Sequence, residues 1–195
     1  MIPVYGFSGR LPHHQKTSFC FAINGNETSP FIHRLENVLI EYESIIQDIV
    51  LEGPSYFFPL ILQAIEIAEK DDDNGTYQIL LLFTDGICND MSDTIDAIVE
   101  ASFLPLSIVI IGLGDSDFSL MDALDSDENL LTDSYSRSAL RDIVQFVPYN
   151  QFEGDIRLSD KILRELPDQV EEYYRYKGIQ PGVPIEGLLK TKYKI

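Results

Sequence analysis

Two side chains, Ser55 and Asp85, stand where an α/β sheet would bring ligand-binding groups together. Asp85 directly follows an apolar run over residues 78–84 and precedes Gly86, and Ser55 lies at the start of an expected helix. A hydroxyl and carboxylates form the ligand set of a hard, octahedral cation such as Mg²⁺. A second interpretation makes Ser55 a helix cap and Asp85 a turn residue. The residue types therefore predict a candidate cation site and leave the structural alternative open.

The other motifs at expected strand ends are less specific. The sequence GLG at residues 112–114 follows a strand but lacks the third glycine of a dinucleotide fingerprint. Asp115 begins the sequence DSD, which opens like a calcium loop, but Leu120 and Ser126 stand where an EF-hand needs glycine and glutamate. A carboxylate after a buried strand can also act as the nucleophile of aspartyl-phosphate chemistry. A metal-dependent phosphotransferase or hydrolase that uses Asp115 or Asp85 is therefore the alternative function.

Apolar patterning predicts the elements that position these residues. Unbroken apolar runs over residues 78–84 and 106–111 are typical of strands covered on both faces of a parallel sheet. Predicted strands and helices alternate along the chain, which indicates an α/β fold. We expect a doubly wound, mostly parallel sheet flanked by helices, with its ligand-binding edge at the carboxyl ends of the strands. Pro167 should kink or split the last helix. The remaining elements are strands over residues 3–7, 19–23 and 143–147, and helices over residues 32–46, 60–68, 91–102 and 158–176.

The balance of charge limits the partners. The chain has 195 residues, with 32 Asp and Glu against 14 Lys and Arg, and a net charge of −18. Nucleic acids and anionic membranes attract basic faces, so we expect no nucleic-acid partner and no direct membrane binding by this chain. The charge favours cations or basic protein surfaces instead. Part of it is expected to gather at the carboxyl edge of the sheet, on Asp85, Asp90, Asp115 and Asp117.

Cysteine usage and hydropathy point to the compartment. Cys20 and Cys88 form neither a CxxC motif nor a Cys/His cluster, and two free thiols are typical of a reducing cytosol. The most apolar stretch, residues 103–114, is interrupted by Pro105 and is shorter than the roughly 20 residues of a membrane span. We therefore expect a soluble, cytoplasmic protein.

Several segments, in the same order along the chain, resemble the copine family, specifically its C-terminal von Willebrand factor A-type domain. The similarity covers about residues 2–180, and its most specific piece is ALRDIVQFVP at residues 139–148. The resemblance implies a von Willebrand factor A-like, Rossmann-type fold and a non-catalytic module that binds target proteins. Further matching pieces are LEGPS at residues 51–55, TDGI at 84–87, DMSDT at 90–94 and ASFLPLS at 101–107.

The resemblance also implies a metal-ion-dependent adhesion site for magnesium or manganese. In that site an Asp-x-Ser/Thr-x-Ser/Asn motif follows the first strand, a threonine lies in a second loop, and an aspartate follows a later strand. Asp85 matches the aspartate, and Ser55 matches the threonine with its hydroxyl retained. The first motif has no counterpart in this sequence, so the expected site is partial, and magnesium or manganese is expected only where the site is complete. A target protein would place a carboxylate on the ion.

For a full-length copine the resemblance implies calcium-dependent phospholipid binding, membrane-linked signalling and recruitment to the plasma membrane. The two lipid-binding domains that would do this are not found in these residues. We expect residues 1–178 to form a partial domain without the first strand and helix, and residues 179–195 to form a flexible tail. This expectation leaves three alternatives: an incomplete gene model, a truncated paralogue or a non-functional fragment.

Overall fold

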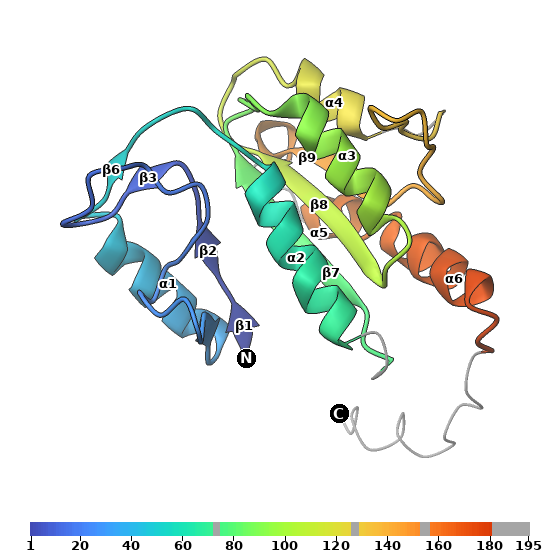
Figure 1. The fold of residues 1–195 in the computed structure, drawn as a ribbon, viewed down its shortest axis with the longest axis horizontal. Coiled ribbons are helices and arrows are strands. Elements are labelled where there is room, and N and C mark those ends of the chain that lie inside the picture. The colour runs from blue at the N-terminus through green and yellow to red at the C-terminus, as the bar shows by residue number, and fades with distance from the viewer. Residues whose placement is uncertain (72–74, 126–128, 153–156, 181–195) are drawn as a thin grey trace.

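The chain folds around a parallel sheet with helices on both of its faces (Figure 1). The structure is a computed structural model, and it describes residues 1–71, 75–125, 129–152 and 157–180. The strands β7 (Gln78–Thr84), β8 (Leu106–Gly112) and β9 (Val144–Pro148) are parallel and lie in that order. The predicted α/β class is confirmed, with a three-stranded parallel sheet that is compatible with a von Willebrand factor A-like fold.

The central strand β8 is buried along its whole length, as its apolar run predicts. On one face, Ile108 and Ile110 join the main core with α2 (Phe58–Asp71), α3 (Met91–Ala101) and α4 (Ser119–Leu124). On the other face, Val109 and Ile111 pack against Leu166 and residues of α5 (Arg157–Ile162). A strand between two helical layers needs apolar side chains in both directions, which is why its pattern is continuous rather than alternating.

The prediction that β7 is covered on both faces is wrong. β7 lies at the edge of the sheet, and its alternate residues Ile79, Leu81 and Phe83 are 52%, 47% and 52% exposed. Leu82 and Thr84 point to the opposite face, where they are buried. An apolar run cannot by itself distinguish a central strand from an edge strand, because the distinction depends on the neighbours. The result is a stripe of apolar side chains on the open side of β7.

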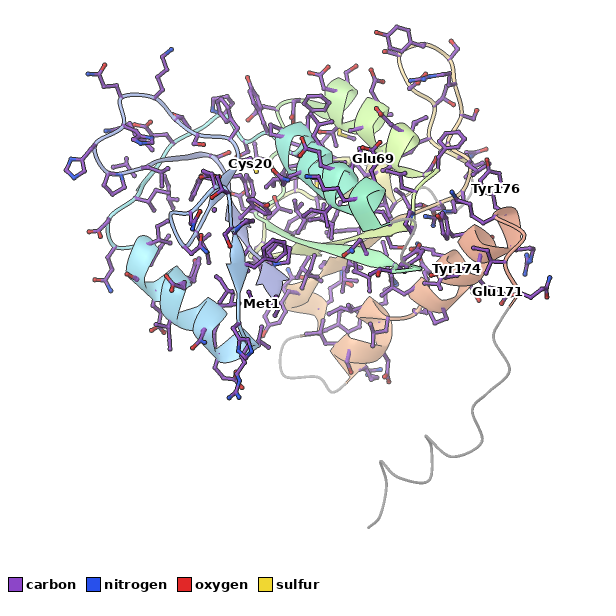
Figure 2. All side chains as sticks on the ribbon, turned by 60° about the horizontal axis from the view of Figure 1, so that its bottom comes forward. Met1, Cys20, Glu69, Glu171, Tyr174 and Tyr176 are labelled. Carbon is purple, nitrogen blue, oxygen red and sulfur yellow. The ribbon has the colours of Figure 1, made fainter. Side chains whose placement is uncertain are left out.

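The final helical stretch is split, as predicted, and the split lies over residues 163–165, just before Pro167. The first part is α5, and the second is α6 (Leu166–Tyr176), where Pro167 occupies the first turn and lacks only an N–H that would have no partner inside the helix. From α6, the Tyr174 hydroxyl donates a hydrogen bond to the carbonyl of Gly75 at 3.0 Å (Figure 2). The end of α6 therefore lies beside the chain that leads into β7.

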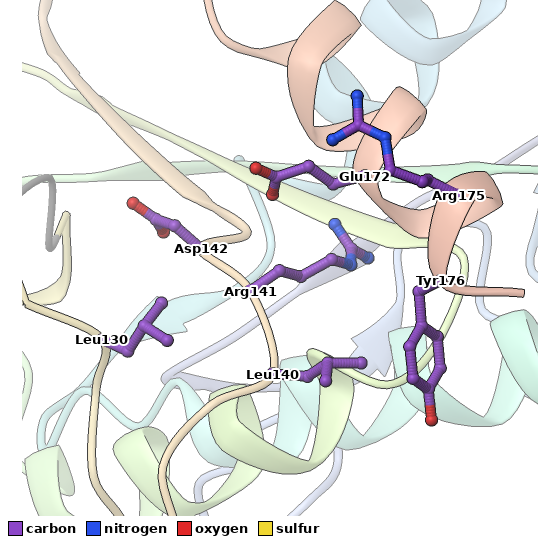
Figure 3. A pocket seen from close by; sticks show the side chains of 7 residues that line it. All are labelled: Leu130, Leu140, Arg141, Asp142, Glu172, Arg175 and Tyr176. Atoms are coloured by element: carbon purple, nitrogen blue, oxygen red, sulfur yellow. The ribbon is translucent and has the colours of Figure 1, made fainter.

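A buried arginine joins α6 to the sheet. Arg141 is 5% exposed and extends from the loop before β9 toward α6 (Figure 3). Its Nη2 donates to the carbonyls of Leu104 and Leu106 at 2.6 and 2.8 Å, and its Nη1 donates to the Tyr77 hydroxyl at 2.9 Å and the Gln169 carbonyl at 3.3 Å. One side chain thus fixes the entrances to β7, β8 and β9 against α6. This gives the ALRDIVQFVP segment a structural role.

Residues 1–52 form an N-terminal lobe that does not join the main sheet. The predicted strands at residues 3–7 and 19–23 do pair, but antiparallel and with each other. Phe7 from this lobe meets Phe57 edge-to-face, with ring centroids 5.9 Å apart. Figure 1 shows the lobe beside α2 and β7. Its pairs are β1 (Ile2–Pro3) with β5 (Phe31–Ile32), β2 (Tyr5–Gly6) with β4 (Phe21–Ala22), and β3 (Gly9–Arg10) with β6 (Val50–Leu51).

The predicted helix over residues 32–46 is α1 (Leu35–Ile45), and its apolar face is covered only in part. Val38 and Ile45 pack against a small cluster of the lobe, whose buried members are Phe21, Ile23 and Ile32. Leu35, Leu39 and Tyr42 are exposed. The helical periodicity is therefore confirmed, whereas full burial of the face is not.

Most of the expected tail, residues 181–195, lies outside the described residues. Among the helices of the described part, none combines the length and apolar character needed to cross a membrane.

Candidate metal and ligand site at the carboxyl edge of the sheet

The loop that carries Ser55 is tied to the loop after β7. The Ser55 N–H donates to Asn89 Oδ1 at 2.7 Å, and the Asn89 N–H donates back to the Ser55 carbonyl at 2.8 Å. The Gly53–Pro54 peptide bond is cis, and the Pro54 carbonyl accepts a hydrogen bond from Ser8 Oγ at 3.0 Å. Three segments distant in sequence therefore meet at this edge. Asn89 was not predicted, because nothing in the sequence indicates which loop it joins.

Ser55 and Asp85 both line one large groove, and that they bind a cation together stays a prediction. Asp85 is exposed, and its Oδ1 accepts a long hydrogen bond from the Ile87 N–H at 3.4 Å. Ser55 Oγ has no hydrogen-bond partner among the described residues. The groove has a volume of about 1360 Å³, and we call it the β7 groove; its walls come from β1, β2, α1, α2, β6 and β7.

Asp90, and not Ser55, caps the start of α2, so the alternative role of Ser55 as a helix cap is wrong. The two carboxylate oxygens of Asp90 accept hydrogen bonds from the Phe57 and Phe58 N–H groups at 3.0 and 2.9 Å. These are N–H groups at the start of α2, which the helix itself cannot satisfy. Thr94 Oγ1 donates to the same carboxylate at 3.2 Å. Asp90 is therefore engaged in structure, and the Ser55 hydroxyl remains available to a ligand.

The two aspartates after β8 have different partners, Asp115 in the segment after β9 and Asp117 in its own loop. Asp115 Oδ1 accepts from Asn150 Nδ2 at 2.9 Å. Asp117 Oδ1 accepts from the Ser119 N–H at 2.9 Å, and this backbone hydrogen bond lowers the pKa of Asp117 below its ordinary value. The four aspartates predicted to gather do follow β7 and β8, but each carboxylate has a separate hydrogen-bond partner.

Close contact between the loops after β7 and β8 explains why residue 86 is a glycine. Its φ is +98°, and a Cβ there would lie 2.9 Å from Cδ1 of the Phe118 ring and 3.1 Å from the Asp117 carbonyl oxygen. A side chain at position 86 would therefore be strained by its backbone and would push the β7 and β8 loops apart. The Asp-Gly pair after β7 is thus required by packing as well as by turn chemistry.

The ligands present fit a magnesium or manganese ion in type but not in number. Ser55 and Asp85 offer a hydroxyl and a carboxylate, which are hard oxygen ligands, whereas an octahedral ion needs six. In the described part of the chain, no three His, Cys, Asp or Glu side chains form a group that could hold a metal. The Asn89 side-chain oxygen is occupied by the Ser55 N–H. The described residues thus supply part of a coordination shell.

Cys88 lies under this edge and should react slowly. Burial is the largest cause that raises the pKa of Cys88 to about 11, and it raises the pKa of Cys20 to the same value. At pH 8 we expect the thiolate fraction, and so the rate of alkylation by iodoacetamide, to be about 100-fold below that of the unfolded chain. Mass spectrometry of alkylation between pH 7 and 10, in buffer and in urea, measures this. A rate in buffer that levels off near pH 9 would contradict it.

The family of the chain follows from its sequence. The segments that resemble copines lie in the sheet and at its edge. Residues 51–55 contain Ser55, residues 84–87 and 90–94 flank its partner Asn89, and residues 139–148 carry Arg141 and β9. A family model described as Copine matches residues 1–182. On that match, which spans most of its length, the chain belongs to the copine family.

Proposed function

We propose that this copine domain is a non-catalytic protein-binding module that receives target proteins at the carboxyl edge of its sheet. The observation that carries the proposal is that Ser55 and Asp85 both line the β7 groove. The lining of the groove is largely apolar and includes a few polar groups, which is the usual composition of a ligand site. Open doubly wound sheets bind ligands at this edge.

A divalent cation is part of the proposal. Magnesium or manganese bound by Ser55 and Asp85 would supply positive charge on an acidic surface, so that a carboxylate of the target could complete the coordination. This accounts for how a chain with a net charge of −18 could bind an acidic target. Calcium-dependent phospholipid binding and recruitment from the cytoplasm to the plasma membrane belong, in this proposal, to the lipid-binding domains of a longer copine.

Substitution of Asp85 tests the cation site. We expect Mn²⁺ to bind the chain weakly, with a dissociation constant of about 0.1–1 mM because few ligands come from the protein. Asp85→Asn should weaken this binding at least tenfold, and Ser55→Ala should weaken it less, since the lost hydroxyl is uncharged. The electron paramagnetic resonance signal of free Mn²⁺ measures the binding directly.

Asp115→Asn is the matched control, because Asp115 lies at the same edge and is held by Asn150. Its affinity for Mn²⁺ should equal that of the unchanged chain. Equal binding by the unchanged chain and Asp85→Asn, or no binding by either, would contradict the cation site. Magnesium-dependent hydrolysis of a generic phosphomonoester that Asp115→Asn abolishes would replace the binding module with the phosphotransferase.

A further inference from the structure

A pocket between α6 and the loop before β9 lies near the amino ends of the strands, away from Ser55 and Asp85 (Figure 3). Arg141 lines it and bonds to the carbonyls of Leu104 and Leu106, where β8 begins. The pocket has a volume of about 470 Å³, within the roughly 300–1,000 Å³ of small-ligand sites. We call it the α6 pocket, and besides Arg141 it is lined by Leu130, Leu140, Asp142, Glu172, Arg175 and Tyr176.

Part of the α6 pocket is apolar. Leu130 and Tyr176 are exposed, and Leu140 is half-buried. An aliphatic stem that lies on these side chains would remove apolar surface from water. Lysine and arginine side chains bury such a stem while the charged head stays at a polar rim. The face of the Tyr176 ring can also attract a cation. This part of the pocket therefore suits a long cationic side chain.

The pocket also carries carboxylates that a cation could meet. Glu172 extends from α6 toward the loop that carries Asp142 (Figure 3), and it has no hydrogen bond or ion pair among the described residues. Asp142 is the second carboxylate of the lining, and its Oδ1 accepts from the Val144 N–H at 3.0 Å. The charge of Arg175 is offset by its ion pair with Glu171. Complementary charge in the occupant is therefore positive.

Arg141 adds a donor that has no acceptor. The side chain is 5% exposed, and its Nη groups have the partners described above, whereas its Nε has none among the described residues. The carbonyls on the Nη groups partly offset the guanidinium charge that a ligand cation would otherwise meet. A buried N–H without an acceptor is unfavourable, so an oxygen supplied by a ligand would be stabilised there. A lysine or arginine residue in a peptide offers both a cation and a main-chain carbonyl.

We propose that the α6 pocket binds a lysine or arginine residue in a basic segment of a partner protein. The cationic head pairs with Glu172 and Asp142. The stem lies against Leu140 and Tyr176, and the main-chain carbonyl of the bound residue accepts from Arg141 Nε. The net charge of −18 attracts such a segment over longer distances. This site needs no metal ion and lies apart from the proposed cation site.

Titration with a short peptide tests this proposal in the intact chain, with EDTA present so that the result does not depend on the cation site. The probe is acetyl-Ala-Arg-Ala-amide, which carries one cation and no terminal charge. NMR should show shifts of the Leu140 and Glu172 amide signals and of the Arg141 Nε–H signal, and none at Asp85. We expect a dissociation constant of about 0.5–5 mM, because one side chain carries the affinity.

Glu172→Gln should weaken this binding at least fivefold, because the head of the bound residue loses its unpaired carboxylate partner. Asp168→Asn is the matched control, since it removes one exposed carboxylate of α6 outside the pocket. Its dissociation constant should stay within twofold of that of the unchanged chain. Norleucine in place of arginine keeps an aliphatic stem and loses the charge, so this peptide should also bind at least fivefold more weakly.

Equal binding by the unchanged chain and Glu172→Gln, or of the arginine and norleucine peptides, would overturn the proposal. An equal loss in Asp168→Asn would reduce the effect to general attraction by an acidic chain and would overturn it too. Tighter binding of acetyl-Ala-Glu-Ala-amide would assign the pocket to an anion held by Arg141 and Arg175. The absence of shifts at Leu140 and Glu172 up to about 20 mM peptide would exclude the site.

Discussion

Replacement of Arg141 by methionine is expected to lower the free energy of unfolding by about 3–5 kcal/mol. The guanidinium is buried and donates to three backbone carbonyls and the Tyr77 hydroxyl. Methionine fills similar space but makes none of these hydrogen bonds, each of which contributes about 1.5–3 kcal/mol when one partner is charged. The Leu104 and Leu106 carbonyls keep one other donor each, the Leu106 N–H and the Tyr77 hydroxyl, so the expected loss is smaller than the sum. The Tyr173 ring, 5.4 Å from the guanidinium carbon, also loses a cation–π contact. Urea unfolding followed by circular dichroism measures the change.

Two further variants separate the causes of this loss. Arg141→Lys keeps the charge but cannot direct donors in a planar fork, so we expect at least half of the full destabilisation. Arg175→Met is the matched control, because Arg175 is exposed on α6 and pairs with Glu171, an interaction that contributes about 0–1 kcal/mol. If Arg141→Met costs no more than Arg175→Met, the buried arginine does not hold the sheet and α6 together.

Replacement of Asp90 by alanine is expected to lower the free energy of unfolding by about 2 kcal/mol and to loosen the candidate site. The Phe57 and Phe58 N–H groups would lose their acceptors, and α2 would fray at its first turn. The same turn follows the loop that holds Ser55 against Asn89. We therefore expect faster exchange of the Phe57 and Phe58 amides and weaker Mn²⁺ binding in the same variant.

Asp90→Asn should lower the free energy of unfolding by about half as much as Asp90→Ala. The asparagine oxygen still accepts one hydrogen bond, whereas the negative charge near the start of α2 is lost. Asp93→Ala is the control, since Asp93 is an exposed carboxylate in the first turn of α3 and should cost less than about 1 kcal/mol. Unchanged exchange at Phe57 and Phe58 in Asp90→Ala would show that the carboxylate does not cap α2.

Local pattern was sufficient to predict most of the parallel sheet. The apolar runs of β7, β8 and β9 and the break at Pro167 follow from backbone and hydropathy rules that need no knowledge of neighbours. Burial was predicted correctly for β8 and wrongly for β7, because an edge position is a property of the assembled sheet. For the same reason, the periodicity of α1 predicted a helix but not which of its apolar residues are exposed.

The candidate site was predictable in part. Position after a strand and before a helix placed Ser55 and Asp85 at one edge, and the structure puts both on one groove. Asp90 and Asn89 were missed in their actual roles, because each bonds to a segment more than 30 residues away. A helix cap is usually sought within a few residues of the helix, whereas this one comes from the following loop of the sheet.

The separate pairing of the N-terminal lobe has a consequence for synthesis on the ribosome. All three of its strand pairs close within residues 2–51, so they can form before β7 has been made. The sheet, in contrast, is complete only when Pro148 has left the ribosome. At 5–20 residues per second, β7 waits about 3–13 s for β9. During that interval, the finished lobe can already shield apolar residues of β7 and α2 from other nascent chains.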